Sequence, residues 1–175
     1  MTEHKVRVLI EESEVDKRIE EIGKKISEEY AGKSIHLVCV LKGGAFFMCE
    51  LAKRITVPVS MDFMAVGSYG NGTASSGVLK IKKDLDETIE GKEVLIVEDI
   101  IDSGNTLYKL TNMLRARNPK SLEVCALLDK PDRREVDVDV KYTCFSIPDE
   151  FVVGYGLDYA QLYRNLPYIG VVEFE

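Results

Sequence analysis

The chain lacks the apolar segments that mark membrane-spanning and exported proteins. Its longest apolar runs, around Val38 and Val94, are far shorter than the roughly 20 residues that a membrane-spanning helix needs. The first residues show no basic start followed by an apolar stretch, so no secretion signal is predicted. We therefore expect a cytoplasmic protein without membrane contact.

Features of disulfide-bonded, zinc-binding and polyanion-binding proteins are also scarce. The cysteines form no C-x-x-C pair, and the histidines His4 and His36 have no spaced partner that would suggest zinc. With 23 basic and 30 acidic side chains the formal charge is −7, which disfavours nucleic acid as a partner. Each cysteine has apolar neighbours, which predicts reduced, buried thiols at Cys39, Cys49, Cys125 and Cys144.

Two common nucleotide-binding motifs are absent. No G-x-x-x-x-G-K-[ST] occurs, which disfavours a P-loop enzyme. Gly154 and Gly156 begin a G-x-G-x-x-G pattern, but Tyr159 stands where its last glycine belongs. An anionic ligand must therefore be held by another local arrangement.

The length of 175 residues suits one hydrophobic core, so we expect a single domain over 1–175. Ser13, with Asp16 three residues later, predicts the start of an amphipathic helix that ends near Gly32. Its apolar positions predict that it packs on one face of the domain.

A strand, a turn and a helix then follow one another twice. Residues 35–41 form an apolar run, Gly43 and Gly44 form a turn, and residues 45–55 switch to helical spacing. The second unit has a buried strand over 93–97, a polar turn and a helix that reaches Arg117. Residues 121–128 supply a third apolar strand. This pattern predicts an α/β fold in which helices flank a parallel sheet, with ligands at the carboxyl ends of the strands.

The segment 67–77 is rich in glycine and serine and lies between the apolar segments 59–66 and 78–81. It exceeds the usual hairpin connection of two to five residues. We therefore interpret it as a flexible lid rather than an ordinary exposed turn.

Residues 94–106 carry the strongest functional signal. The buried strand ends in two acids, Glu98 and Asp99, and the turn Asp102–Thr106 leads into a helix. Backbone N–H groups at a helix N-terminus favour a phosphate dianion, and Gly104 permits close approach. The two acids would repel that phosphate and instead suit hydroxyl groups or a divalent cation. A phosphorylated sugar satisfies both demands better than a simple helix cap with two solvated acids.

This stretch resembles the phosphoribosyl-pyrophosphate signature of type I phosphoribosyltransferases. Four further segments resemble the hypoxanthine-guanine members of that family, in the same order and approximate spacing, and they are 41–44, 68–69, 127–130 and 151–159. The resemblance covers most of the chain. It implies the type I fold, an α/β architecture with a parallel twisted sheet flanked by helices and a small hood built from the terminal segments.

The resemblance also implies a reaction. A purine salvage enzyme of this kind transfers the phosphoribosyl group from 5-phosphoribosyl 1-pyrophosphate to hypoxanthine or guanine, giving IMP or GMP and pyrophosphate. It would use Mg²⁺ and assemble as a homodimer or homotetramer. Because the transition state has oxocarbenium character, placement of charge is the catalytic problem.

The resemblance assigns roles by ligand group. Asp102 would be the catalytic acid or base at purine N7. Ribose and the 5′-phosphate would be bound by Glu98, Asp99, Ser103, Gly104, Asn105 and Thr106. Pyrophosphate would be bound by Lys42, Gly43 and Arg164, next to a Leu41–Lys42 peptide that is often cis in the family. The purine would contact Lys130, Phe151 and Val152, the lid would contribute Ser68 and Tyr69, and the metal would be held by Asp158, Glu98 and Asp99.

Two of these residues predict base preference. The ammonium of Lys130 has donors only, so it favours a 6-oxo group over the amino group of adenine. The carbonyl of Val152 can accept from the guanine amino group but would repel O2 of xanthine.

Asn105 departs from family members that carry lysine, which leaves the backbone donors to bind the phosphate.

Several alternatives remain open on the sequence. An RNA-binding regulator on the same fold would need a basic face, and a related salvage enzyme could prefer xanthine. A receiver-type signalling domain has a similar acidic strand end, but too few residues follow Asp99 for that fold. Ordinary structural roles also compete at individual positions, namely a surface lysine at Lys42, a surface ion pair at Arg164 and core packing at Phe151.

Overall fold

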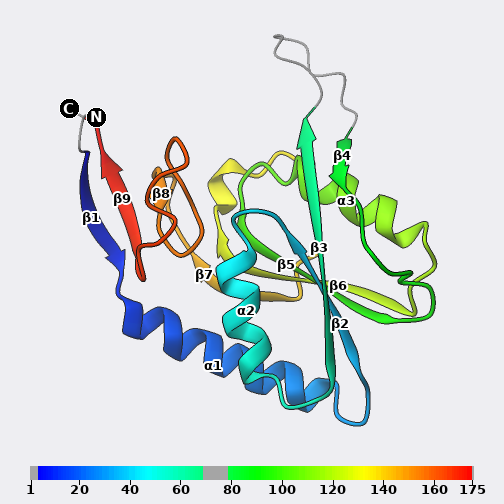
Figure 1. The fold of residues 1–175 in the computed structure, drawn as a ribbon. Coiled ribbons are helices and arrows are strands. Elements are labelled where there is room, and N and C mark those ends of the chain that lie inside the picture. Colours follow the sequence, from blue (N-terminus) through cyan, green and yellow to red (C-terminus); the bar gives the residue numbers. More distant parts are fainter. Residues whose placement is uncertain (1–3, 69–78, 175) are drawn as a thin grey trace.

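Six strands form a twisted sheet at the centre of the protein. The computed structural model describes residues 4–68 and 79–174 (Figure 1). The strand order is β4-β3-β2-β5-β6-β7, in which only β4 runs antiparallel to its neighbour. The strands are β2 (Ile35–Val40), β3 (Val59–Ser68), β4 (Leu79–Lys83), β5 (Glu93–Ile101), β6 (Ser121–Asp129) and β7 (Tyr142–Ser146). This arrangement confirms the predicted α/β class.

Helices cover both faces of this sheet because the strand side chains alternate between two apolar clusters. Leu37 and Cys39 of β2 face α1 (Glu12–Glu29) and α2 (Ala45–Arg54), whereas Val38 and Val40 belong to the cluster beneath α3 (Asn105–Arg115). In Figure 1, α1 and α2 lie on the opposite side of the sheet from α3. Strands buried on both faces explain the continuous apolar runs in the sequence.

The start of α1 corrects one prediction. The helix begins at Glu12, so Ser13 lies inside its first turn and is not the N-cap. Glu11 holds the N-cap position, and its backbone N–H donates to Oε2 of Glu14 at 3.1 Å. A capping box built from two glutamates escaped a pattern that expects serine or threonine at its first position.

A second, three-stranded sheet stands beside the main one. Its antiparallel strands, in the order β1-β9-β8, are β1 (Lys5–Ile10), β9 (Ile169–Glu173) and β8 (Val152–Val153). Figure 1 shows the two described ends of the chain side by side at this sheet. It is the hood that was expected from the terminal segments.

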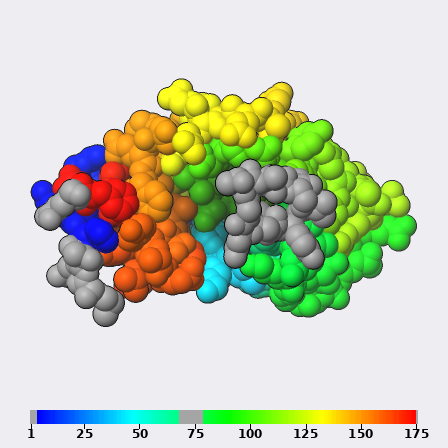
Figure 2. Space-filling view, turned by 90° about the horizontal axis from the view of Figure 1, so that it is seen from above, coloured from blue at the N-terminus to red at the C-terminus, as the bar shows by residue number. Residues whose placement is uncertain are grey.

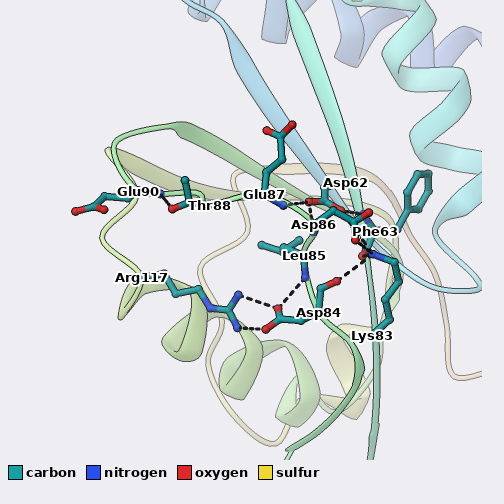
Figure 3. A network of polar contacts seen from close by, with 10 residues as sticks. All are labelled: Asp62, Phe63, Lys83, Asp84, Leu85, Asp86, Glu87, Thr88, Glu90 and Arg117. Atoms are coloured by element: carbon teal, nitrogen blue, oxygen red, sulfur yellow. Dashed lines mark hydrogen bonds and ion pairs between the residues drawn. The ribbon is translucent and has the colours of Figure 1, made fainter.

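The segment after β4 is fixed by a buried acid. Asp62 of β3 accepts hydrogen bonds from the backbone N–H groups of Phe63, Asp86 and Glu87 at 2.7, 2.8 and 3.2 Å (Figure 3). Burial opposes the ionised form, but these three donors and the positive charge of Lys83 outweigh it and lower the pKa of Asp62. The turn that leads to β5 is thereby tied to the edge of the main sheet.

Three of the four cysteines lie where the sequence predicted them. Cys39, Cys125 and Cys144 are buried free thiols as expected, but Cys49 is exposed on α2, because its apolar neighbours in sequence lie on the other side of the helix. The predicted lid begins within β3, but most of it, including Tyr69, lies outside the described residues. No helix in the described part of the chain is long and apolar enough to cross a membrane.

Candidate active site

A cleft of about 280 Å³ lies where the central strands end. Strand β5 runs to Ile101, beyond the predicted end at Val97, because it stays paired with β6 as far as Asp129. Glu98 and Asp99 therefore belong to the last residues of the strand, and they line the cleft together with the turn that follows. Figure 2 shows the surface hollowed between the orange C-terminal segment and the green central segments.

The two acids are held in an environment that disfavours their charge. Glu98 is only 8% exposed, and burial raises its pKa well above the usual range, with a further rise from the charge of Asp99. Burial also raises the pKa of Asp99, although the N–H of Ile100 and the charge of Arg164 oppose the shift. Carboxyls whose charge is disfavoured by burial suit hydroxyl donors of a ligand.

The turn after these acids has the geometry of an anion site. Gly104 has φ +84°, and a Cβ there would lie 2.9 Å from the carbonyl oxygen of Val136, so glycine is required. It is the N-cap of α3, which means that Asp102 does not cap this helix. Thr106 lies in the first turn of α3, where backbone N–H groups lack acceptors within the helix. The turn is therefore available to a phosphate.

The side chain of Asn105, which stands where some family members carry lysine, is hydrogen-bonded to its neighbours. Its Nδ2 donates to Oε2 of Glu135 at 2.6 Å and to Oγ of Ser103 at 3.2 Å. The backbone N–H groups of Glu135 and Val136 bond to the carbonyl of Ser103 at 2.9 and 3.3 Å. The Asn105 side chain thus fixes the outer side of the turn.

A second glycine turn meets the acids from the end of β2. The Leu41–Lys42 peptide is cis, as the family resemblance implied. A Cβ at Gly43 would lie 1.5 Å from Oδ2 of Asp99, so no side chain fits between them. Gly156 packs just as closely from the C-terminal segment, since a Cβ there would lie 2.0 Å from the carbonyl oxygen of Gly43.

Three of the residues predicted to bind pyrophosphate or metal come together beside this turn, namely Lys42, Arg164 and Asp158. Arg164 pairs with Oδ1 of Asp158 at 2.7 Å and donates to the carbonyl of Gly156 at 2.6 Å. Lys42 is linked to Asp158 through Gln161, whose Oε1 accepts from Lys42 Nζ at 3.0 Å and whose backbone N–H donates to Oδ2 of Asp158. Sequence reasoning missed Gln161, because a polar residue in a C-terminal turn carries no signal of its own.

Lys130, a predicted purine residue, lies beside the cleft, where its backbone N–H donates to the carbonyl of Ile101 at 2.9 Å. Lys130 is buried, and its Nζ lies 3.8 Å from Oδ1 of Asp149. Asp102 lines the cleft, and its Oδ1 accepts from Nε of Arg133 at 3.0 Å. Arg133 also approaches Oδ2 of Asp149 at 3.6 Å. Neither Arg133 nor Asp149 was predicted, because isolated charged residues are usually solvated.

Phe151 and Val152 occupy the hood side of the site. Phe151 is 46% exposed rather than buried in the core, and its ring makes edge contacts with Tyr159 and Phe174 at centroid distances of 5.6 and 5.8 Å. Val152 is buried in β8 and pairs with Val171. Ser68 ends β3, and the predicted lid contact by Tyr69 falls outside the described residues.

The acidic residues of the site could serve as ligands of a metal ion. In residues 4–68 and 79–174, no three acidic, histidine or cysteine side chains converge on one cation position. The charge of Asp158 still contributes to the raised pKa of Asp99, and carboxylate oxygens of this kind suit Mg²⁺. Magnesium is commonly held by one or two carboxylates with substrate phosphates and water, so these residues fit it once a phosphorylated substrate is bound.

Together, the features define an α/β domain with a cleft at the carboxyl edge of its parallel strands, lined by two acids and by the glycine turn that begins α3. The model of the phosphoribosyl transferase domain family matches residues 10–160. A hypoxanthine phosphoribosyltransferase of Salmonella typhimurium is 57% identical over 171 residues, covering 97% of this chain and 96% of the relative.

Solved structures agree with this match. A hypoxanthine phosphoribosyltransferase from Staphylococcus aureus has a TM-score of 0.92 and 50% identity, covering 95% of this chain and 91% of that one. A hypoxanthine-guanine phosphoribosyltransferase from Bacillus anthracis also has a TM-score of 0.92, with 45% identity and coverage of 98% and 100%. The chain belongs to the phosphoribosyltransferase family, which confirms the resemblance drawn from its motifs.

Proposed function

We propose that the protein is a purine salvage enzyme that transfers the phosphoribosyl group of 5-phosphoribosyl 1-pyrophosphate to hypoxanthine or guanine, with release of pyrophosphate. The observation that carries this proposal is the arrangement of one cleft. It is lined by the buried Glu98, the partly buried Asp99 and Asp102, and by the glycine turn before α3, and Lys130 lies beside it, bonded through its backbone N–H to the carbonyl of Ile101. The family relationship supports the same activity.

The donor is bound by the turns at the ends of β5 and β2. Backbone N–H groups of residues 103–106 hold the 5′-phosphate, and Glu98 and Asp99 accept hydrogen bonds from the ribose hydroxyls. These hydrogen bonds replace solvent around two poorly hydrated carboxyls. They also orient the sugar with its C1′ toward the base. Lys42, Arg164 and the backbone at Gly43 hold the pyrophosphate, whose negative charge increases as the bond to C1′ breaks.

The base is oriented by groups that read one edge of a 6-oxopurine. The Lys130 ammonium donates to O6, and Asp102 exchanges a proton with N7 as the bond to C1′ forms. Phe151 stacks on the ring, and the backbone of Val152 contacts its far edge. Adenine places an amino group opposite Lys130, which would leave a buried ammonium facing another donor.

Magnesium is part of the same proposal. When bound, Mg²⁺ would neutralise charge on the departing pyrophosphate, with Asp158, Asp99 and Glu98 as its protein-side oxygen ligands. The raised pKa of Glu98 makes it a weaker candidate ligand than Asp158, which remains half-buried and paired with Arg164. The remaining proposals are a single domain over 1–175, a lid at 67–77 with Ser68 and Tyr69, a cytoplasmic location and a homodimer or homotetramer.

One assay tests the activity and its specificity. The protein is incubated with 5-phosphoribosyl 1-pyrophosphate, Mg²⁺ and each of hypoxanthine, guanine, xanthine and adenine, and nucleotide is quantified. Hypoxanthine and guanine are expected to exceed xanthine, with adenine inactive. Preferred use of adenine would refute the role of Lys130, preferred use of xanthine would favour the related salvage enzyme, and no nucleotide from any base would refute the proposal. Salt-dependent RNA binding without transfer would favour the regulatory alternative.

A further inference from the structure

Four charged side chains of alternating sign connect the two groups that would read the purine. Lys130 faces Asp149 at 3.8 Å, Asp149 faces Arg133 at 3.6 Å, and Nε of Arg133 donates to Oδ1 of Asp102 at 3.0 Å. Lys130 follows β6 and Asp102 follows β5, so two neighbouring strands end in this chain of charges. Asp149 precedes the hood strand β8, which joins the hood to the same network.

Arg133 engages one oxygen of the Asp102 carboxylate and leaves the other free for a ligand. Oδ1 accepts from Nε of Arg133, whereas Oδ2 makes no hydrogen bond to any residue that the structure describes. A carboxylate fixed through one oxygen has fewer available rotamers, so its second oxygen is held in a defined direction. Asp102 lines the cleft, where a base would approach.

The spacing between Asp102 and Lys130 matters because both contact adjacent atoms of the same base. O6 and N7 lie on one edge of a 6-oxopurine, so a small displacement of either side chain would spoil one of the two contacts. Catalytic groups depend on such placement to a fraction of an ångström. A rigid connection between the two side chains would keep this spacing while the site is empty.

We propose that Arg133 is a positioning residue that, together with Asp149, fixes the Asp102 carboxylate relative to the Lys130 ammonium for a 6-oxopurine. This inference rests on the proposed phosphoribosyl transfer and adds to it a residue that contacts neither substrate. Arg133 acts on the base half of the reaction, so binding of the phosphoribosyl donor does not depend on it.

The surroundings of Arg133 separate this role from a contribution to folding. The Arg133 and Asp102 side chains are 52% and 47% exposed, and exposed ion pairs contribute little to stability. The variant Arg133→Gln should therefore fold normally, which circular dichroism and thermal melting can verify. Arg117→Gln is a matched control, because Arg117 pairs with Asp84 through two hydrogen bonds of 2.8 and 2.9 Å in a region outside the cleft (Figure 3).

The experiment measures kcat and both KM values for the full-length chain with hypoxanthine and 5-phosphoribosyl 1-pyrophosphate. Arg133→Gln is expected to lower kcat by about 10-fold, the effect of losing one orienting hydrogen bond to an ionised group, and to leave the KM for the donor within about twofold. Arg133→Lys, which keeps the charge without the planar fork, should recover part of the rate. Arg117→Gln should behave like the unmodified protein.

A double-mutant cycle decides whether the effect passes through Asp102. In an Asp102→Asn background, Arg133→Gln should cause no further loss, because the group that it orients is no longer functional. An unchanged kcat in Arg133→Gln, or an equal fold loss in both backgrounds, would overturn the inference while leaving the proposed function intact. Absence of transfer by the unmodified protein would instead overturn the proposed function and the inference together.

Discussion

Replacement of Gly43 by alanine tests whether the two glycine turns and the acids at the end of β5 form one rigid unit. A Cβ at this position would lie 1.5 Å from Oδ2 of Asp99 and 2.5 Å from its Cγ, whereas real Cβ contacts essentially never fall below 3.0 Å. The turn or the carboxylate must therefore move by about 1.5 Å or more. Because β5 stays paired with β6 on either side of Asp99, we expect the turn and the Asp99 side chain to share this displacement.

The expected consequences differ for stability and activity. Overpacking of this kind costs about 1–3 kcal/mol of unfolding free energy. A displacement of about 1 Å in a substrate-positioning group can cost about 100-fold in rate, so kcat/KM for the phosphoribosyl donor should fall by about that factor. Urea denaturation gives the first quantity, and initial rates at varied donor concentration give the second.

Gly32 provides the matched control. It has φ +77°, and no atom lies within 4 Å of a Cβ placed there, so Gly32→Ala introduces backbone strain of about 1–2 kcal/mol without a steric clash. This variant should lose similar stability but keep its activity. If Gly43→Ala retains kcat/KM within about threefold, the close contact between Gly43 and Asp99 does not set the geometry of the donor site.

Three further predictions follow from single side chains. Asp102→Asn should lower kcat by about 10²- to 10⁴-fold and preserve donor affinity by calorimetry, and unchanged turnover would remove Asp102 from catalysis. Because the folded state raises the pKa of Glu98, it favours the neutral acid, and this contribution to stability, present below the ordinary value of 4.5, is lost as pH rises toward the raised pKa. Glu98→Gln should therefore melt at a higher temperature than the unmodified protein at pH 8, with the difference shrinking toward pH 5, and a pH-independent difference would contradict this. Asp62→Asn should lose about 2–3 kcal/mol in urea unfolding at neutral pH, because an amide cannot serve all the N–H donors that the carboxylate accepts, and a loss below about 0.5 kcal/mol would show that these bonds are dispensable.

The main sheet could be predicted because its signals are local. Apolar runs followed by glycine or small polar turns fixed the expected positions of β2, β5 and β6, and the carboxyl edge followed from their parallel order. The end of β5 was not predicted correctly, since pairing with β6 extends the strand past Glu98. At the start of α1 the actual cap, Glu11, is a residue that the usual capping pattern does not include.

Parts of the site could not be predicted from the sequence, because they depend on contacts between segments that are far apart in the chain. Arg133 and Asp102 are separated by 31 positions, and Gln161 joins Lys42 across 119 positions. Single arginine or glutamine residues give no periodic or spacing signal, and only the folded chain shows what they touch. The exposure of Cys49 has a similar origin, since helix rotation decides which of several apolar neighbours face the core.

The pairing of β1 with β9 links the earliest and latest strands of the fold. Synthesis delivers β1 long before its partner, so the six-stranded sheet can form while the hood strands still lack their central member. Phe151, which precedes β8, contacts Phe174 after β9 and gains this part of its surroundings only when β9 has formed. A nascent chain halted before β9 would thus carry the turn before α3, whereas the hood sheet and the contact of Phe151 with Phe174 would still be missing.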